Sequence, residues 1–223
     1  MTPGLLDRDG CALVPGVLSA QECAWAVQCA QATADAVGER CLLSHAWCAE
    51  LAGRLRLHTV LSTVLPADAV AVQCTYFEKS SDRNWLVPIH QDLSIAVAER
   101  VDDSRLRAWS HKEGSWFVQA PVAILEQMLA LRVHLDACTD EDGPLRVVLG
   151  SHRSGLIAPD AALRMRDAGT VARCLCAPGA VLAMRPLLLH ASSKSIGTSR
   201  RRVLHFLFGP RTLAHGLRWH TAV

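Results

Sequence analysis

The sequence predicts one mainly β domain, a cupin-like jelly roll with helices packed on its outside. Two helix-like stretches come first, and seven or so short strand-like runs separated by turn signals follow. Half of the 223 residues are apolar and a fifth are charged, which is typical of a globular chain with one sizeable core. We expect one single domain over 1–223, with a largely helical part at 1–66 and the jelly-roll core at 69–208.

The expected helices have clear sequence signals. The first begins at Ser19, where Ser is followed three residues later by Glu22 in the pattern of a capping box, and it runs to about residue 38. The second covers 45–57, where large apolar residues recur at helical spacing (Trp47, Leu51 and Leu55). A short third helix is expected at 161–168.

The strand-like runs are richest in β-branched and apolar residues and are bounded by Gly, Pro and Asp clusters. They cover 69–78, 87–93, 128–136, 145–149, 171–175, 180–189 and 201–208. The segment from Glu99 to Ser115 is polar and aromatic by turns without a clean period, so we expect an irregular loop there. Residues 99–120, with Trp109 and Trp116, are a candidate lid.

Charge and cysteine content exclude several classes of function. A net charge of +2 gives no reason to expect a nucleic acid or an anionic membrane as partner. The sequence shows neither the apolar run of a secretory signal nor a stretch long enough to span a bilayer. The nine cysteines contain no C-x-x-C pair, so reduced thiols in a cytoplasmic protein are expected rather than disulfides or a zinc site.

Two histidines and one carboxylate are the candidates for a metal site. His90 and Asp92 lie two apart in a strand-like run, and residues two apart on a strand share a face. His190 follows the apolar run 186–189. Two His and one carboxylate leave three positions open on Fe(II) for a bidentate co-substrate and O2. An isolated H-x-D or a lone His is usually structural; the order and spacing of the three favour a common site.

A run of three arginines, 200–202, begins the last strand. A guanidinium beside the metal can hold a distant carboxylate through a charge-assisted pair. Arg201 shares a strand face with His205, whereas Arg200 and Arg202 share the opposite face. If Arg201 points into the barrel, the other two point toward solvent.

Between residues 76 and 208 the sequence resembles the phytanoyl-CoA dioxygenase family. The resemblance rests on NWLVPIHQD at 84–92, DEDGPLRVVLGSH at 140–152, HASS at 190–193 and the arginine run. Leu149 stands where the family usually has Pro, a departure that touches a turn and no chemistry.

The resemblance implies a double-stranded β-helix and an enzyme that uses Fe(II), 2-oxoglutarate and O2. It carries the metal ligands onto His90, Asp92 and His190 and the 2-oxoglutarate arginine onto Arg201. By a less specific match to the family pattern, it also implies that Gln91 and Ser192 contact the co-substrate. The implied reaction converts 2-oxoglutarate to succinate and CO2 while a C–H bond of a small metabolite is oxidised, most simply by hydroxylation. Halogenating relatives replace the carboxylate with a small residue, so Asp92 favours hydroxylation over halogenation.

Substrate recognition is expected on 128–136. Its alternation places Arg132 and His134 on the face that lines the active site in relatives, with Trp109 as a further candidate contact. The competing interpretation is an edge strand whose polar face lies in water. An inward Arg132 needs an anionic partner, and Asp136 lies roughly 13 Å further along an extended strand. We therefore expect a small substrate with a carboxylate or similar polar head, not a bulky acyl-CoA.

Two other functions fit the same residues. A cupin-type hydrolase or isomerase would use the three ligands with Zn(II) or Mn(II), although Arg201 favours a dicarboxylate co-substrate. A barrel that binds a ligand without turnover is the other alternative.

Overall fold

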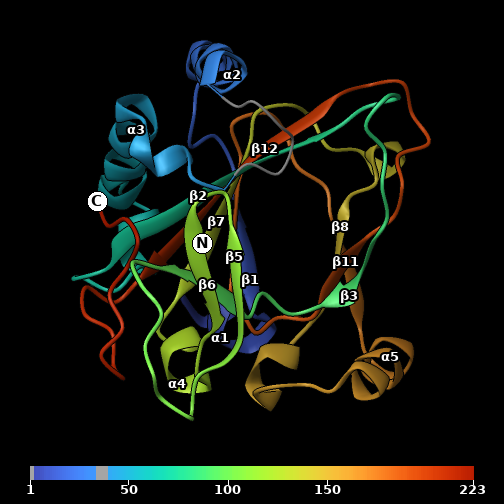
Figure 1. Ribbon diagram of the computed structural model, residues 1–223. Helices are drawn as coiled ribbons and strands as arrows, with labels where there is room; N and C mark the ends of the chain where they lie inside the picture. Colours follow the sequence, from blue (N-terminus) through green and yellow to red (C-terminus); the bar gives the residue numbers. More distant parts are fainter. Residues whose placement is uncertain (1–2, 34–39) are drawn as a thin grey trace.

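The computed structural model describes residues 3–33 and 40–223, which form two main antiparallel sheets and a smaller third one (Figure 1). The first sheet has the order β1 (Cys11–Val14), β10 (Val181–Met184), β7 (Leu129–His134), β12 (Arg201–Gly209) and β2 (Val70–Lys79). The second has the order β3 (Val87–His90), β11 (His190–Ser192), β8 (Leu145–Val148) and β9 (Val171–Cys174). The third joins β4 (Ser94–Val97), β6 (Ser115–Gln119) and β5 (Arg107–Lys112). The predicted jelly roll is confirmed.

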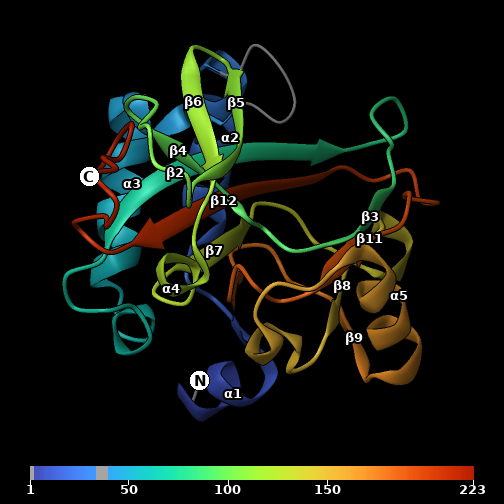
Figure 2. The same cartoon turned by 60° about the horizontal axis from the view of Figure 1, so that its bottom comes forward.

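Helices cover the outer faces of the two main sheets (Figures 1 and 2). The helices α2 (Ala20–Thr33) and α3 (Ala46–Leu57) pack on the first sheet, and α5 (Pro159–Ala168) packs beside the second. The short helices α1 (Pro3–Asp9) and α4 (Val122–Leu125) were not predicted. No helix in the described part of the chain is long and apolar enough to cross a membrane.

The capping box expected at the start of α2 is present. The backbone N–H of Ser19 donates to Glu22 Oε2 at 2.6 Å, and the N–H of Glu22 donates to Ser19 Oγ at 3.3 Å. These bonds satisfy backbone donors that a helix start leaves free. Residues 34–38 of the predicted helix lie outside the described residues.

The two faces of the first sheet have opposite roles. Its outer face buries Phe206, Phe208 and Leu131 against α2 and α3, and each such side chain contributes about 1.5–3 kcal/mol by its burial. The inner face carries His205 directly opposite Arg132 in the β12–β7 pairing. Period-2 alternation thus places the apolar residues under the helices and the polar ones between the sheets.

The strand β7 lies in the middle of its sheet, between β10 and β12, and all six of its residues are buried. The interpretation of 128–136 as an edge strand with its polar face in water is therefore excluded. Arg132 and His134 face the interior of the barrel.

Two predicted strands are shorter than expected near the histidines. The strand β3 ends at His90, so Asp92 lies just beyond it, where its N–H donates to the Pro186 carbonyl at 2.9 Å. Of the predicted strand 180–189 only β10 forms, because a turn at 185–188 ends it, and β11 begins at His190. Pro186 has no N–H for a ladder bond, which explains the break.

The segment 99–115, predicted as an irregular loop, contains strand β5 and the turn leading to β6. Glu113 and Gly114 both have positive φ (51° and 72°), as a two-residue hairpin turn requires. In β5 the pairing shifts between Arg107 and Ser110, and Ala108 has φ 52°. Such a bulge breaks the period-2 pattern on which the sequence prediction depended. The short strands β1 and β4 were also missed. All nine cysteines are free thiols.

Candidate active site

A cavity of about 340 Å³ opens between the sheets. Strands β2, β7 and β12 supply one wall, and β3, β11 and β8 supply the facing wall. Residues from the third sheet, Ser94, Phe117 and Lys112, contribute to the lining as well. The cavity therefore collects side chains that are far apart in the sequence.

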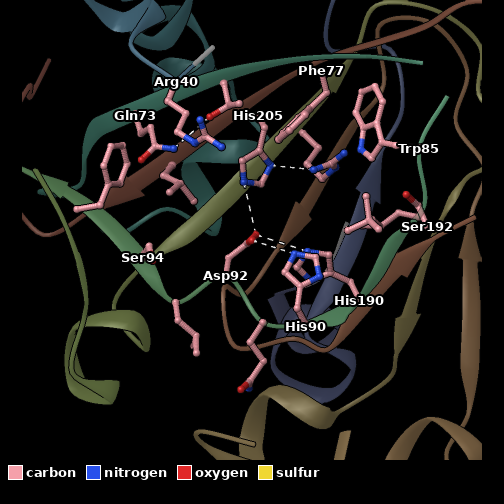
Figure 3. Close-up of a pocket in the computed structure, with 18 of the residues that line it drawn as sticks. Arg40, Gln73, Phe77, Trp85, His90, Asp92, Ser94, His190, Ser192 and His205 are labelled. Carbon is pink, nitrogen blue, oxygen red and sulfur yellow. Dashed lines mark hydrogen bonds and ion pairs between the residues drawn. The ribbon is translucent and has the colours of Figure 1, made fainter. Parts of the chain in front are cut away.

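His90, Asp92 and His190 meet at one side of this cavity (Figure 3). His90 at the end of β3 is the register partner of His190 at the start of β11, and their ring centroids are 4.2 Å apart. The Nε2 atoms of His90 and His190 lie 3.6 Å and 3.7 Å from Asp92 oxygens. One ligand atom from each residue lies within 4.8 Å of the others, which is a spacing that suits a single ion.

Backbone carbonyls orient both imidazole rings. His90 Nδ1 lies 2.8 Å from the Pro88 carbonyl, and His190 Nδ1 lies 2.9 Å from the Leu188 carbonyl. A carbonyl only accepts, so Nδ1 carries the proton and Nε2 presents its lone pair toward Asp92. This is the arrangement that metal-binding histidines normally have.

The pKa values of His190 and Asp92 suit metal binding, whereas His90 holds its proton more tightly. Burial, the largest effect, lowers the pKa of His190 to about 4, so this ring is neutral at pH 7. Burial opposes protonation of His90 as well, but the hydrogen bond and charge of Asp92 outweigh it and raise the pKa of His90. Burial alone would raise the pKa of Asp92, yet His190, His90 and His205 together hold it far below its usual range.

The Gln91 side chain links the segment of His90 and Asp92 to the turn that precedes His190 and to the loop at 155–157. Its amide nitrogen donates to the carbonyls of Leu187 (2.7 Å) and Gly155 (2.8 Å), and its oxygen accepts from the Ile157 N–H (2.9 Å). Both amide hydrogens are donated to backbone carbonyls, which fixes the Gln91 side chain beside the ligands, and Gln91 also lines the cavity.

A third imidazole, not predicted as a site residue, lies on the other side of Asp92. His205 Nε2 is 3.7 Å from Asp92 Oδ2, and His205 Nδ1 is 3.2 Å from Arg132 Nη1. A guanidinium only donates, so Nδ1 accepts and Nε2 carries the proton of a neutral ring. Burial and then Arg132 lower the pKa of His205 to about 3.

The three arginines of β12 point as the alternation predicts. Arg201 is 5% exposed and lines the cavity, and its Nε and Nη1 have no hydrogen-bond partner in the part of the chain that the structure describes. Arg200 lies outside, 3.9 Å from Glu78. Arg202 is not solvated as expected: it makes a two-pronged ion pair with Asp136 at 2.6 and 2.7 Å.

The predicted substrate residues lie in different places. Arg132 lines the cavity and stacks 5.5 Å from the Phe77 ring. His134 is buried behind it, outside the lining, with neither ring nitrogen hydrogen-bonded. Trp109 also lies outside the lining and packs edge-on against Trp116 at 6.3 Å, which does not support a substrate contact.

Lys79 is a cavity residue that the sequence analysis missed. It lies on β2 with Gln73, Thr75 and Phe77, which form the polar face of that strand. Its Nζ donates to the hydroxyl of Ser192 at 2.8 Å. The alternation along β2 contained the signal, because Lys79 shares a strand face with Gln73 and Thr75.

The fold and the site define a class: a double-stranded β-helix with a two-His, one-carboxylate centre, as in non-haem iron enzymes that use 2-oxoglutarate. The model of the family "Phytanoyl-CoA dioxygenase (PhyH)" matches residues 6–203. The chain belongs to this family, and it is a non-haem iron, 2-oxoglutarate-dependent enzyme whose cofactors are Fe(II), 2-oxoglutarate and O2.

Solved structures share the fold. HygX from Streptomyces hygroscopicus with nickel and 2-oxoglutarate bound has a TM-score of 0.64 at 18% identity, over 93% of this chain and 84% of that one. EctD from S. alaskensis with bound Fe has a TM-score of 0.68 at 20% identity, over 93% and 75%. The non-haem alpha-ketoglutarate-dependent epimerase SnoN, from nogalamycin biosynthesis, has a TM-score of 0.67 at 15% identity, over 94% and 81%. A comparison with curated proteins found no match.

Proposed function

We propose that this protein oxidises, and in the simplest case hydroxylates, a C–H bond of a small metabolite, with conversion of 2-oxoglutarate and O2 to succinate and CO2. One oxygen atom of O2 enters succinate and the other enters the product, so the atoms balance. The observation that carries the proposal is the convergence of His90, Asp92 and His190 in one cavity beside the inward Arg201, whose Nε and Nη1 have no partner within 3–33 and 40–223.

We assign the iron to His90, Asp92 and His190. The fit rests on the donor set, because both Nε2 atoms and the carboxylate face a common point and both Nδ1 atoms are held by carbonyls. When bound, the iron supplies the site at which 2-oxoglutarate chelates and O2 is activated. The protein holds the metal ligands, the co-substrate and the substrate in the positions and orientations that the reaction needs.

We assign binding of the distal carboxylate of 2-oxoglutarate to Arg201. Two of its nitrogens are buried without a hydrogen-bond partner among the described residues, and burial of an unpaired guanidinium costs several kcal/mol. A carboxylate is the planar, bidentate anion that matches it. Ser192 lines the same part of the cavity and has a hydroxyl that can join the contact.

The substrate is proposed to be a small molecule with an acidic group. The cavity lies at the low end of the range of about 300–1,000 Å³ for small-molecule sites, and the co-substrate takes part of it. Among residues 3–33 and 40–223, Arg132 forms no ion pair with a carboxylate, since Asp136 is engaged by Arg202, and the Arg132 Nε is buried without a hydrogen bond. An acidic head on the substrate would supply the missing charge.

The test is metabolite-dependent succinate formation. The iron-loaded protein is incubated with 2-oxoglutarate, O2 and a metabolite extract, and consumed and formed species are followed by mass spectrometry with isotopically labelled O2. Hydroxylation predicts one labelled oxygen in the product, whereas an epimerisation, the reaction named for SnoN, predicts none. Turnover by the Zn(II) or Mn(II) form without 2-oxoglutarate would instead favour the hydrolase or isomerase alternative.

One variant tests the proposed class of substrate separately. Arg132→Leu is expected to lower the affinity for the true substrate about tenfold or more and to leave the affinity for 2-oxoglutarate unchanged. Unchanged substrate turnover in this variant would contradict the acidic-group proposal and leave the oxygenase assignment in place.

A further inference from the structure

His205 is a buried imidazole that faces the proposed metal site without belonging to it. It is 5% exposed and lies on β12, directly opposite Arg132 on β7. Its Nε2 is 3.7 Å from Asp92 Oδ2 (Figure 3). Within the described part of the chain, the group whose ligand atoms all lie within 4.8 Å of one another is His90, Asp92 and His190, without His205.

Arg132 determines which nitrogen of His205 carries the proton. Arg132 Nη1 lies 3.2 Å from His205 Nδ1, and a guanidinium only donates. Nδ1 is therefore the acceptor, and the proton of the neutral ring is on Nε2, on the side of Asp92. A protonated Nε2 has no lone pair for a metal, so Arg132 keeps His205 from becoming a further protein ligand of the iron.

His205 is the imidazole beside Asp92 that can donate a hydrogen bond to its carboxylate. Three imidazoles lie 3.6–3.7 Å from the carboxylate oxygens among the described residues. His90 and His190 present lone pairs at Nε2, because carbonyls hold their Nδ1–H groups. The His205 contact, at 3.7 Å, is about 0.7 Å longer than an ordinary hydrogen bond. Such contacts often tighten only when a site is occupied.

The number of Asp92 oxygens on the iron decides how many positions stay open. Two imidazoles and one carboxylate oxygen leave three positions, which 2-oxoglutarate and O2 together require. If both oxygens of Asp92 bound the iron, 2-oxoglutarate would fill the remaining positions and leave none for O2. A hydrogen bond that engages one carboxylate oxygen opposes binding through both.

We propose that His205 is a positioning residue, whose Nε2–H holds Asp92 Oδ2 so that the carboxylate binds iron through Oδ1 alone. This inference rests on the proposed function. Arg132 is part of the device, because it keeps the proton on Nε2. His205 thereby acts through Asp92 to keep one position on the iron free after 2-oxoglutarate has bound.

A purely structural role makes a different prediction. The His205 side chain is buried in the cavity wall, so its loss could loosen β12 and the site as a whole. Such loosening would weaken every ligand of the iron, with or without 2-oxoglutarate. The positioning role affects only the position that remains once 2-oxoglutarate is in place.

The experiment uses nitric oxide as a probe in the iron-loaded protein without O2, because it occupies the position of O2 on Fe(II). Its binding is read from the paramagnetic resonance signal of the iron adduct, with and without saturating 2-oxoglutarate. His205→Leu and His205→Phe both remove the donor, one with a smaller side chain and one with a flat ring. In both, the affinity for nitric oxide is expected to fall about tenfold or more with 2-oxoglutarate, and to stay within about twofold without it.

Two further variants serve as controls. His205→Gln keeps an amide oxygen to accept from Arg132 and an amide N–H to donate to Asp92, and is expected to restore most of the binding. Thr75→Val changes the partner of His205 in the β2–β12 ladder, on the same cavity wall, and is expected to behave like the unaltered protein.

Unchanged nitric oxide binding in His205→Leu and His205→Phe would overturn the proposal and leave the proposed function standing. An equal loss with and without 2-oxoglutarate, loss of iron from both variants, or failure of His205→Gln to restore binding would overturn it as well. If one of the two holds no iron, the other decides. If the unaltered protein binds no nitric oxide in the presence of 2-oxoglutarate and gives no complex with 2-oxoglutarate, the proposed function itself fails.

Discussion

At the scale of single residues, each proposed iron ligand is oriented by a neighbour. Carbonyls two residues before each histidine hold Nδ1, and three imidazoles surround the carboxylate of Asp92. Each of the three ligands is therefore prepared for a metal before one binds. Removal of a supporting group costs about 10- to 100-fold in metal affinity, and removal of a ligand costs more.

We expect His90→Ala, Asp92→Ala and His190→Ala each to lose stoichiometric Fe(II), because a three-ligand site cannot hold the ion well with two. The measurement is iron content after desalting. His111→Ala, at an exposed position of β5, is the matched control and is expected to keep the iron. Full iron in any two of the three ligand variants would remove the assignment.

Metal binding is expected to release a proton from His90. The pKa of this ring is raised above 6.5, so near and below that pH the ring is protonated and must lose its proton to bind iron. His190, with a pKa of about 4, is already neutral there. Calorimetry in buffers of different ionisation enthalpy should give about one proton released per Fe(II) near pH 6, falling toward zero at high pH. A release that does not change with pH would contradict this.

The raised pKa of His90 also makes the stability of the metal-free protein depend on pH. A raised folded-state pKa means that protonated His90 adds stability below pH 6.5 and that this contribution is lost as the pH rises through the folded pKa.

At the scale of elements, alternation on β12 decides which arginine enters the cavity. We expect Arg201→Ala to weaken 2-oxoglutarate by one to two decades, about 1.5–3 kcal/mol, and Arg200→Ala to leave it unchanged. Arg202→Ala breaks the pair with Asp136 on the outer face and should lower the free energy of unfolding without altering co-substrate affinity. If Arg200→Ala or Arg202→Ala weakened 2-oxoglutarate binding instead, the assignment of Arg201 to the cavity face of the strand would be wrong by one residue.

The start of α2 provides a prediction about stability. Ser19→Ala removes the side-chain half of the capping box and should lower the free energy of unfolding by about 1 kcal/mol, with iron binding intact. Ser81→Ala, in an exposed turn, is the control and is expected to change nothing measurable. Chemical denaturation checks both, and equal stability of Ser19→Ala and the parent would contradict the role of the cap.

Sequence patterns predicted elements where local signals agree and missed them where tertiary contacts decide. The strands β2, β7, β8, β9 and β12 and the helices α2, α3 and α5 follow from periodicity and turn residues. The strand β5 could not be predicted, since its bulge at Ala108 breaks the alternation. Four-residue strands such as β1 and β4 give too short a pattern and are fixed by their partners in the sheet.

At the scale of the whole molecule, the jelly roll brings together residues more than a hundred positions apart. The H-x-D segment and His190 could be paired in advance because their order and spacing match a family pattern. Lys79 and His205 could not, because their roles depend on cross-strand neighbours, Arg201 and Arg132, that only the sheet order reveals. The interior therefore carries a charge distribution that is not visible along the chain.

The central claim is that one cavity binds Fe(II) through His90, Asp92 and His190 and then binds 2-oxoglutarate on that iron. The most direct measurement is an anaerobic titration of the iron-loaded protein with 2-oxoglutarate, followed by visible absorbance. We predict a saturable charge-transfer band at about one equivalent of 2-oxoglutarate per iron, absent from Asp92→Ala. Stoichiometric iron binding without any 2-oxoglutarate-dependent band, or an unchanged band in Asp92→Ala, would contradict the account.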